Sequence, residues 1–498
     1  MLTDKEILRL QNGSDVRGIA IDGVEGEPVN LTSEAVNRIA SGFVKFLATK
    51  LGKTDLKIAI GHDSRVSAPM IKAAAIRALV ANGVKVIDCG LASTPAMFMS
   101  IIFDETKADG SIMLTASHLP FNRNGMKFFT AEGGLEKSDI KTVLTNACSI
   151  EEKLGDISAV EKFDLIDLYS KHLVRIIREK IGRGEQPLKG MKIVVDAGNG
   201  GGGFFATKVL EPLGADTTGS QFLEPDGMFP NHIPNPEDKK AMAAIRAAVL
   251  ENKADLGLIF DTDVDRMSAV LSDGEDVSRN ALIAMMAAIL APDYPHSTIV
   301  TDSVTSDGLH KFLEAELGLK HHRFKRGYKN VINECIRLNN SGIVSPLAIE
   351  TSGHGALSEN YYLDDGAYLA VKLLIAAARA HAEGKSLSTL IEKLEYPAET
   401  VEYRLKINDE NFREYGSKVL DEFRRRAEQA GLKFAEPNFE GVRLIFDGGW
   451  ALLRQSLHDP NMPLNIESDV AGDCKKIAVE IKNLLGGFDK LDLSCFDR

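Results

Sequence analysis

The stretch Leu256-Gly257-Leu258-Ile259-Phe260-Asp261-Thr262-Asp263-Val264-Asp265-Arg266 passes from a short apolar run directly into three alternate aspartates. The apolar run has the length and composition of a buried strand, and open α/β sheets place their binding sites at the carboxyl ends of such strands. Alternate side chains of an extended segment share one face, so the three carboxylates are expected to converge. Their mutual repulsion calls for a hard cation with oxygen ligands. We therefore predict a Mg²⁺ site at Asp261, Asp263 and Asp265, with Arg266 beside it as an anion clamp.

Two other interpretations of the acidic stretch have less support. An EF-hand loop requires Gly at its sixth position and Glu at its twelfth, where this chain has Arg266 and Ser272. A solvated acidic turn is the second alternative. The preceding apolar run argues against it, because that run places the aspartates at the end of a buried strand.

Length and composition indicate a globular protein of several domains. With 498 residues the chain exceeds what one core usually serves, and roughly 100–200 residues per domain suggests about three or four domains. The net charge of −12 argues against non-specific nucleic-acid binding, which needs a basic surface. Five widely spaced cysteines without CxxC spacing indicate neither a disulfide framework nor a zinc site.

The sequence favours a cytoplasmic protein without a membrane partner. The amino-terminal residues lack an apolar signal core, and no later run reaches the roughly 20 apolar residues that span a bilayer. The sequence does not indicate an oligomeric state.

Strand-like and helix-like segments alternate along most of the chain, which is the βαβ pattern of parallel or mixed sheets. The expected strands are residues 56–60, 84–88, 111–114, 191–196, 297–301 and 347–350, and the expected helices are residues 68–82, 165–181, 307–317 and 365–384. Beyond about residue 398 the pattern changes to strands at 401–405 and 441–446 around one charged helix. We predict an α/β fold with three domains of similar size over residues 1–162, 163–275 and 276–395, and a C-terminal α+β cap over residues 396–498.

A second candidate site lies in the segment Thr115-Ala116-Ser117-His118-Leu119-Pro120, which is followed by Asn124-Gly125-Met126-Lys127. Ser117 comes directly after a predicted strand, so its hydroxyl is expected to be accessible there. A Ser-His pair without a GxSxG turn is not typical of a hydrolase. We therefore expect His118 to be a local electrostatic partner rather than a general base.

Two further groups of residues suit a phosphorylated sugar. Arginine makes bidentate contacts to phosphate, and Arg17 and Arg65 lie in glycine-containing loops. Arg454 is another such residue, with Ser456 and His458 at alternate positions after it. The segment Glu350-Thr351-Ser352-Gly353-His354 alternates an acceptor, a hydroxyl and an imidazole, which suits a polyol. A metal site at Glu350 and His354 is less well supported, because a third ligand is missing.

Together these segments resemble the α-D-phosphohexomutase family, the phosphoglucomutases and phosphomannomutases, over nearly the whole chain. The residues around Ser117 are similar to the family's phosphoserine loop, and the three aspartates are similar to its metal loop. Residues 350–354 and 454–460 are similar to its sugar and phosphate loops. Supporting matches are Arg17, Asp63 with Arg65, Arg279, and Gly327-Tyr328-Lys329. The resemblance implies four domains around a central cleft, three related α/β domains and the C-terminal cap.

The resemblance also implies a reaction, a reversible transfer of phosphate between O1 and O6 of a glucose or mannose phosphate. Phosphorylated Ser117 would form a hexose 1,6-bisphosphate, which also serves as activator, and Mg²⁺ would be bound by Ser117 and the three aspartates. Ser117, His118, Lys127 and Arg17 would be catalytic, with Lys127 the first candidate for proton transfer and His118 the second. The implied substrate-binding residues are Arg65, Arg266, Arg279, Tyr328, Lys329, Glu350, Ser352, His354, Arg454, Ser456 and His458.

The chain departs from the family pattern at several positions, and two other functions stay open. Leu119 stands where the family usually has Asn, and Ser456-Leu457-His458-Asp459-Pro460 differs from the usual Ser-Asn-Thr-Glu-Pro. These departures motivate a non-catalytic sugar-phosphate-binding protein as one alternative. The other alternative is a haloacid dehalogenase-like phosphatase with Asp261 as nucleophile, which leaves Ser117 and Arg454 without a role.

Overall fold

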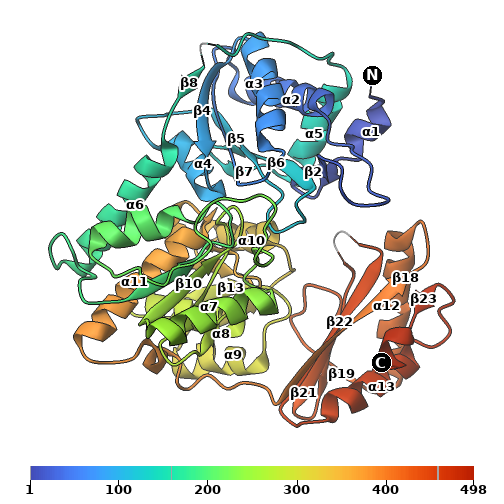
Figure 1. Cartoon of the computed structure of the whole chain (residues 1–498). Coiled ribbons are helices and arrows are strands. Elements are labelled where there is room, and N and C mark those ends of the chain that lie inside the picture. The colour runs from blue at the N-terminus through green and yellow to red at the C-terminus, as the bar shows by residue number, and fades with distance from the viewer. Residues whose placement is uncertain (1, 159, 457–458, 498) are drawn as a thin grey trace. The chain divides into compact units, whose positions relative to one another are not determined.

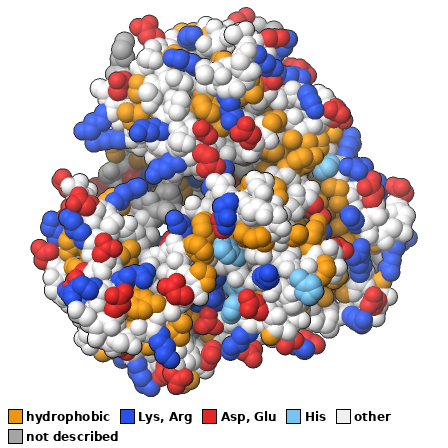
Figure 2. All heavy atoms as spheres, turned by 180° about the vertical axis from the view of Figure 1, so that it is seen from behind, with side chains coloured by type: hydrophobic (Ala, Val, Ile, Leu, Met, Phe, Trp, Pro, Cys, Tyr) orange, Lys and Arg blue, Asp and Glu red, His pale blue; other side chains and the backbone are white. Residues whose placement is uncertain are grey.

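The computed structural model describes residues 2–158, 160–456 and 459–497. The chain divides into two compact units, one of residues 1–289 and 352–390 and the other of residues 290–351 and 391–498. Among the described residues, no helix is long and apolar enough to cross a membrane. Acidic and basic side chains are interspersed over the face shown in Figure 2.

The first unit begins with an eight-stranded mixed sheet in the order β1-β2-β6-β5-β3-β4-β8, with β7 paired to β6. Its strands are β1 (Gln11–Asn12), β2 (Asp15–Ile19), β3 (Lys57–His62), β4 (Lys85–Leu91), β5 (Gly110–Leu114), β6 (Arg123–Thr130), β7 (Gly133–Gly134) and β8 (Glu161–Lys162). Strand β3 is parallel to β4 and β5, whereas β6 is antiparallel to β2 and β5. Strands β5 and β6 therefore lie side by side, and they carry the segments that contain Ser117 and Lys127.

Helices cover both faces of this sheet (Figure 1). They are α1 (Asp4–Leu8), α2 (Ser33–Leu51), α3 (Ala68–Ala81), α4 (Thr94–Ile102) and α5 (Lys137–Cys148). The apolar residues of α2, α3 and α5, such as Phe43, Ile71 and Leu144, form one buried cluster with strand residues such as Ile60 and Phe128. Helix α4 starts where β4 ends, with Ser93 as its N-cap.

The second sheet of this unit has four strands in the order β12-β11-β10-β9. They are β9 (Ile193–Asp196), β10 (Leu256–Phe260), β11 (Met267–Leu271) and β12 (Asp276–Val277). Strand β10 is parallel to β9 and antiparallel to β11, so the aspartates lie in the connection between β10 and β11. The accompanying helices are α6 (Leu165–Ile181), a π-helix (Phe205–Leu210), a 3₁₀-helix (Glu211–Leu213), α7 (Lys239–Asn252), α8 (Asn280–Leu290) and α11 (Gly366–Ala382).

The short antiparallel pair β16 (Gly355–Leu357) and β17 (Leu363–Asp364) also belongs to the first unit. A 3₁₀-helix (Ser358–Asn360) connects the pair, and Asp365 is the N-cap of α11. The helix start predicted near residue 365 is thus confirmed. Another 3₁₀-helix (Leu387–Leu390) follows α11.

The second unit contains a parallel sheet and an antiparallel sheet. In the parallel sheet, β13 (Thr298–Thr301) lies between β14 (Lys320–Arg323) and β15 (Leu347–Ile349), with α9 (Asp307–Lys311) and α10 (Tyr328–Asn340) as its helices. The helix predicted over residues 307–317 changes at Phe312 into a π-helix (Phe312–Glu316). The sequence pattern predicted the helix but not this change of hydrogen bonding.

The C-terminal sheet has six strands in the order β19-β20-β21-β22-β18-β23. They are β18 (Glu399–Ile407), β19 (Lys433–Phe434), β20 (Val442–Phe446), β21 (Gly449–Leu453), β22 (Asn461–Ser468) and β23 (Leu491–Asp492). Two helices, α12 (Phe412–Gln429) and α13 (Asp473–Leu484), and a final 3₁₀-helix (Ser494–Asp497) accompany them. The predicted α+β character is confirmed, and the charged helix predicted between two of its strands is α12. Helix α13, which follows β22, was not predicted.

Candidate functional site

The three aspartates lie in a tight turn between β10 and β11. Their ligand oxygens all lie within 4.8 Å of one another, and all three residues are buried. The predicted convergence is therefore confirmed, but its expected cause is wrong, because the segment is not extended. Val264 has φ of 66°, which turns the chain between Asp263 and Asp265.

The hydroxyl of Ser117 lies against this acidic turn. Ser117 Oγ donates to Asp261 Oδ2 at 3.0 Å and accepts from Arg266 Nη2 at 2.8 Å. The backbone at Ser117 has φ of 52°, a conformation that is uncommon for a residue with a side chain. The acidic segment and the segment that contains Ser117 thus meet at the Ser117 hydroxyl group.

Arg65 has a different environment from the substrate-binding one predicted for it. The residue is 1% exposed, and its Nε donates to Asp63 Oδ2. Its Nη1 donates to the carbonyl oxygens of Pro120 and Arg123, and its Nη2 donates to those of Ser117 and Leu119. This guanidinium therefore holds the loop that carries Ser117.

Lys127 forms ion pairs with two of the aspartates, at 2.8 Å to Asp263 and 2.5 Å to Asp265. Burial by itself would lower the pKa of Lys127, but the charges of Asp263 and Asp265 outweigh it and raise that pKa well above its usual range. Lys127 is therefore protonated in this arrangement, which disfavours the role of general base proposed for it from the sequence.

Burial is the largest influence on the pKa of His118 and on that of Asp261. Burial, together with the charges of Arg266 and Arg17, lowers the pKa of His118 to about 2, so its ring is neutral and Nδ1 accepts from Arg266 Nη2 at 2.5 Å. This agrees with the electrostatic role predicted for His118. Burial and the neighbouring charge of Asp265 raise the pKa of Asp261 well above its usual range.

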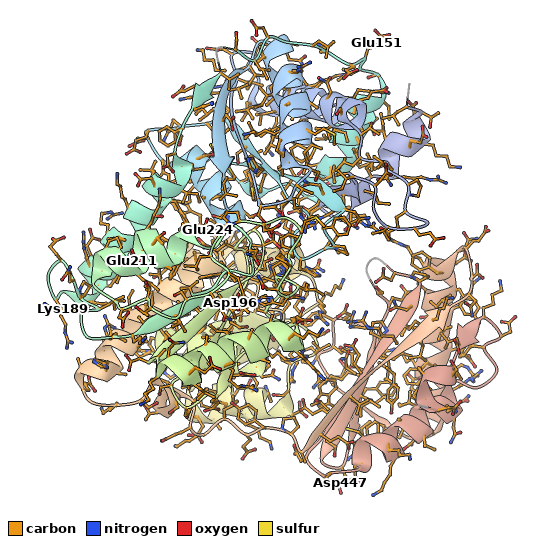
Figure 3. All side chains as sticks on the ribbon, viewed as in Figure 1. Glu151, Lys189, Asp196, Glu211, Glu224 and Asp447 are labelled. Atoms are coloured by element: carbon orange, nitrogen blue, oxygen red, sulfur yellow. The ribbon has the colours of Figure 1, made fainter. Side chains whose placement is uncertain are left out.

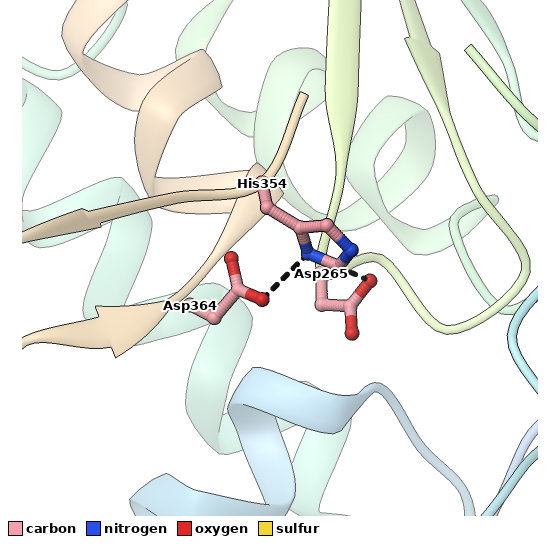
Figure 4. A group of neighbouring side chains, drawn as sticks. All are labelled: Asp265, His354 and Asp364. Carbon is pink, nitrogen blue, oxygen red and sulfur yellow. Dashed lines mark ion pairs between the residues drawn. The ribbon is translucent and has the colours of Figure 1, made fainter. Parts of the chain in front are cut away.

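His354 lies between two carboxylates, those of Asp364 and Asp265 (Figure 4). Its Nδ1 is 2.6 Å from Asp364 Oδ2 and 3.7 Å from Asp265 Oδ1. Burial would lower the pKa of His354, but the two acids raise it to about 9, so we interpret His354 as an ion-pair partner. The expected alternation of residues 350–354 is broken by Gly353, whose φ is 93°.

Two other predicted residues of the first unit, Arg17 and Arg279, form ion pairs with acidic side chains. Arg17 on β2 pairs with Asp15 at 2.9 Å. Arg279 is exposed and lies 3.9 Å from Glu237.

The remaining predicted residues belong to the second unit. Glu350 follows β15 and accepts a hydrogen bond from the backbone N–H of Gly327 at 2.6 Å, directly before Tyr328 and Lys329 at the start of α10. Arg454 follows the last residue of β21 and is 6% exposed. Ser456 Oγ accepts from Asp459 N at 3.1 Å, whereas His458 lies outside the described residues.

The structure also adds residues that sequence patterns did not assign to the site. Thr94 donates from Oγ1 to Asp263 Oδ2 at 2.5 Å, although its sequence context, Ser-Thr-Pro, indicates only a helix start. Asp364 pairs with His354, although its sequence context, directly before Asp365 and Gly366, indicates only part of a helix start. Asp196 at the end of β9, labelled in Figure 3, accepts from His232 Nε2 at 3.0 Å and from Gln221 Nε2 at 2.7 Å.

Three regions of the chain match the domain models of one family. Residues 9–153, 167–274 and 278–396 match phosphoglucomutase/phosphomannomutase alpha/beta/alpha domains I, II and III. A phosphomannomutase/phosphoglucomutase of Pseudomonas putida is 29% identical over 464 residues, which are 93% of this chain and 92% of that protein. A phosphoglucomutase of Neisseria meningitidis is 28% identical over 471 residues, 93% of this chain and 95% of that protein.

The fold is also similar to that of a solved family protein. The crystal structure of a phosphoglucomutase/phosphomannomutase family protein from Burkholderia thailandensis superposes with a TM-score of 0.78 at 25% identity, and the match covers 98% of each chain. That match includes the C-terminal sheet, which lies beyond the three matched domain models.

Proposed function

Because the chain belongs to the phosphoglucomutase/phosphomannomutase family and is a mutase, we propose that it transfers phosphate reversibly between O1 and O6 of a hexose phosphate through phosphorylated Ser117. The observation that carries the proposal is the position of Ser117 Oγ, 3.0 Å from Asp261 Oδ2 and 2.8 Å from Arg266 Nη2. The hexose phosphate in this proposal is a glucose phosphate or a mannose phosphate. We also propose the domain limits 1–162, 163–275, 276–395 and 396–498.

The acidic turn fits a bound Mg²⁺. Asp263 Oδ1 and Asp265 Oδ1 are buried and have no hydrogen-bond partner among the described residues, while Lys127 occupies the Oδ2 atom of each. Two carboxylate oxygens that accept no hydrogen bond from the described residues, beside Asp261, are the ligand atoms that a hard cation prefers. Asp261, Asp263 and Asp265 would hold the ion, which when bound neutralises charge on a transferring phosphoryl group.

The side chains around Ser117 supply positioning and positive charge. Phosphorylated Ser117 transfers its phosphoryl group to the free hydroxyl of the substrate: the Ser117 Oγ–P bond breaks, a bond from phosphorus to the sugar oxygen forms, and a hexose 1,6-bisphosphate results. The proton that the sugar hydroxyl loses is balanced by the proton that Ser117 Oγ takes up as it becomes a free hydroxyl. The second transfer returns the other phosphate to Ser117. Arg266 and protonated Lys127 stabilise the charge on the phosphoryl oxygens in both steps, and such electrostatic stabilisation supplies most of the rate in phosphoryl transfer.

The residues of the second unit suit the non-reacting end of the substrate. The guanidinium of Arg454 is buried, and its Nε has no hydrogen-bond partner in the part of the chain that is described. Burial lowers the pKa of Arg454, and this outweighs the charge of Glu440, which by itself would raise it. We propose that Arg454 binds the non-reacting phosphate, and that Glu350 accepts hydrogen bonds from sugar hydroxyls.

The test is to incubate the protein with Mg²⁺ and hexose 1,6-bisphosphate carrying labelled phosphate, and to map the label. We expect an acid-stable phosphate ester on Ser117. A hydroxylamine-labile acyl phosphate on Asp261 would instead indicate a phosphatase, and the absence of covalent label would indicate a non-catalytic binding protein. Ser117→Ala should lose mutase turnover by several orders of magnitude, and retained turnover in that variant would refute the assigned nucleophile.

A further inference from the structure

Asp263 is held at two points by a single residue, Thr94. The side chain of Thr94 donates from Oγ1 to Asp263 Oδ2 at 2.5 Å, and its backbone N–H donates to the carbonyl oxygen of Asp263 at 2.8 Å. Both residues are buried, with Thr94 3% exposed and Asp263 0% exposed. The two bonds close a ring that fixes both the main chain and the side chain of Asp263.

Thr94 is well suited to this role because it is itself rigid. It is the first residue of α4, and the N-cap Ser93 orders the turn in which it lies. A β-branched side chain has few rotamers, so the hydroxyl has little freedom once the backbone is fixed. The amino-terminal end of α4 also carries partial positive charge, which favours an ionised carboxylate next to it.

The hydrogen bonds that the Asp263 carboxylate accepts from the described residues all go to one of its two oxygens. Oδ2 accepts from both Thr94 Oγ1 and Lys127 Nζ, at 2.5 and 2.8 Å. Oδ1 is buried and has no hydrogen-bond partner among the residues that the structure describes. Lys127 has a long flexible stem and divides its charge between two aspartates, so Thr94 supplies the bond that sets the orientation of the carboxylate.

We propose that Thr94 is a positioning residue that orients Asp263, so that Oδ1 faces a bound divalent cation. The inference rests on the cation site of the proposed function and extends it to a residue of α4. Hydrogen-bond partners of metal ligands typically contribute about 10- to 100-fold to metal affinity. The hydroxyl of Thr94 should therefore be needed for tight cation binding, although it contacts neither cation nor substrate.

The experiment measures the affinity of Mn²⁺ for the full chain without phosphate on Ser117, by titration calorimetry and by the electron paramagnetic resonance signal of free Mn²⁺. Thr94→Val removes the hydroxyl at nearly constant volume, and we expect its Mn²⁺ affinity to fall by about 10- to 100-fold. Thr94→Ser keeps the hydroxyl and should bind nearly as tightly as the wild type. If Thr94 acted by packing alone, Thr94→Ser would bind Mn²⁺ more weakly than Thr94→Val, because serine lacks the methyl group that valine retains.

Thr106→Val is the matched control. Thr106 is 0% exposed and donates from Oγ1 to the carbonyl oxygen of Ser100 at 2.7 Å, so this variant also loses a buried hydroxyl bond in the same domain. Its Mn²⁺ affinity should equal that of the wild type, since Asp263 is untouched. If Thr94→Val does not fold, the same comparison is made between Thr94→Ser and Thr94→Ala.

Two results would overturn the inference, and they differ in what else they exclude. Equal affinities in Thr94→Val and the wild type would show that the hydroxyl does not position Asp263, while the cation site would stand. Absence of Mn²⁺ binding in the wild type would exclude the cation site of the proposed function, and the inference with it.

Discussion

Arg65 donates its hydrogen bonds to other residues of the protein. Carbonyl oxygens of the Ser117 loop accept four of its bonds, and the buried Asp63 accepts another. The ring of Phe229 lies 5.3 Å from its guanidinium carbon. The side chain of Arg65, more than fifty residues earlier in the chain, therefore helps to keep Ser117 at its uncommon φ of 52°.

Arg65→Lys should separate positioning from substrate binding. Lysine keeps the charge beside Asp63 but cannot reach four carbonyl oxygens, so the Ser117 loop should shift. We expect kcat to fall by about 100-fold, the typical cost of a misplacement of about 1 Å, with little change in KM for hexose phosphate. Steady-state kinetics measure both constants, and a melting curve checks that the variant is folded. A rise in KM with kcat preserved would restore the substrate-binding role predicted from the sequence.

For single residues, the sequence predicted which side chains come together better than it predicted the backbone conformation and the contacts that bring them together. The convergence of Asp261, Asp263 and Asp265 was predicted from the alternation of an extended segment, but a turn that places Val264 in a left-handed conformation produces it. Local preference disfavours that conformation for a β-branched residue. Val264 is 0% exposed, so tertiary packing holds it there, and packing of this kind cannot be inferred from a local pattern.

At the scale of elements, periodicity predicted well wherever a start signal accompanied it. Helix α6 has the predicted limits, residues 165–181, and Asp164 caps its first turn. Helix α13 was missed, and its N-cap is Gly472, which has no side chain to cap the helix. The interpretation of Asp364 as part of a helix start was correct for its neighbour Asp365, but a local pattern could not reveal that Asp364 pairs with His354.

The ion pair of His232 and Asp196 connects the end of β9 to the segment that precedes α7 and should make stability depend on pH. Burial by itself would lower the pKa of His232, but the hydrogen bond and charge of Asp196 raise it above its usual value of 6.5. Because the pKa of His232 is higher in the folded state, protonated His232 stabilises that state, and this contribution is fully present below pH 6.5. The contribution is lost as the pH rises through the folded-state pKa.

His232→Asn should remove this part of the pH dependence. We expect the wild type to melt at a higher temperature than the variant below pH 6.5, with the difference shrinking as pH rises through the folded pKa. Melting curves of both proteins across this range measure the effect. A difference in melting temperature that stays constant, or that grows towards alkaline pH, would contradict the assigned ion pair.

At the scale of the whole molecule, each of the two units has its own apolar core. One core lies among β3, β5, β6 and the helices α2, α3 and α5, and another lies within the C-terminal sheet and its helices α12 and α13. The proposed cation site belongs to the first unit. The chain has one tryptophan, Trp450, which is 3% exposed and packs against Val304 and Leu452 in the second unit.

This division predicts that Mg²⁺ stabilises one unit and leaves the other unchanged. A ligand that binds only the folded state at 100 times its Kd adds about 2.7 kcal/mol of stability. We expect calorimetry to show a transition that moves to higher temperature with Mg²⁺, while the melting transition seen in Trp450 fluorescence stays in place. Asp263→Asn is the control, because it removes a ligand of the proposed site and should abolish the calorimetric shift. If Mg²⁺ moves the fluorescence transition by the same amount, the prediction is contradicted, and either the two units unfold together or the ion binds outside the acidic turn. The same titration on Asp263→Asn distinguishes the two explanations. Loss of both shifts in the variant indicates that the units unfold together, and retained shifts indicate that the ion binds elsewhere.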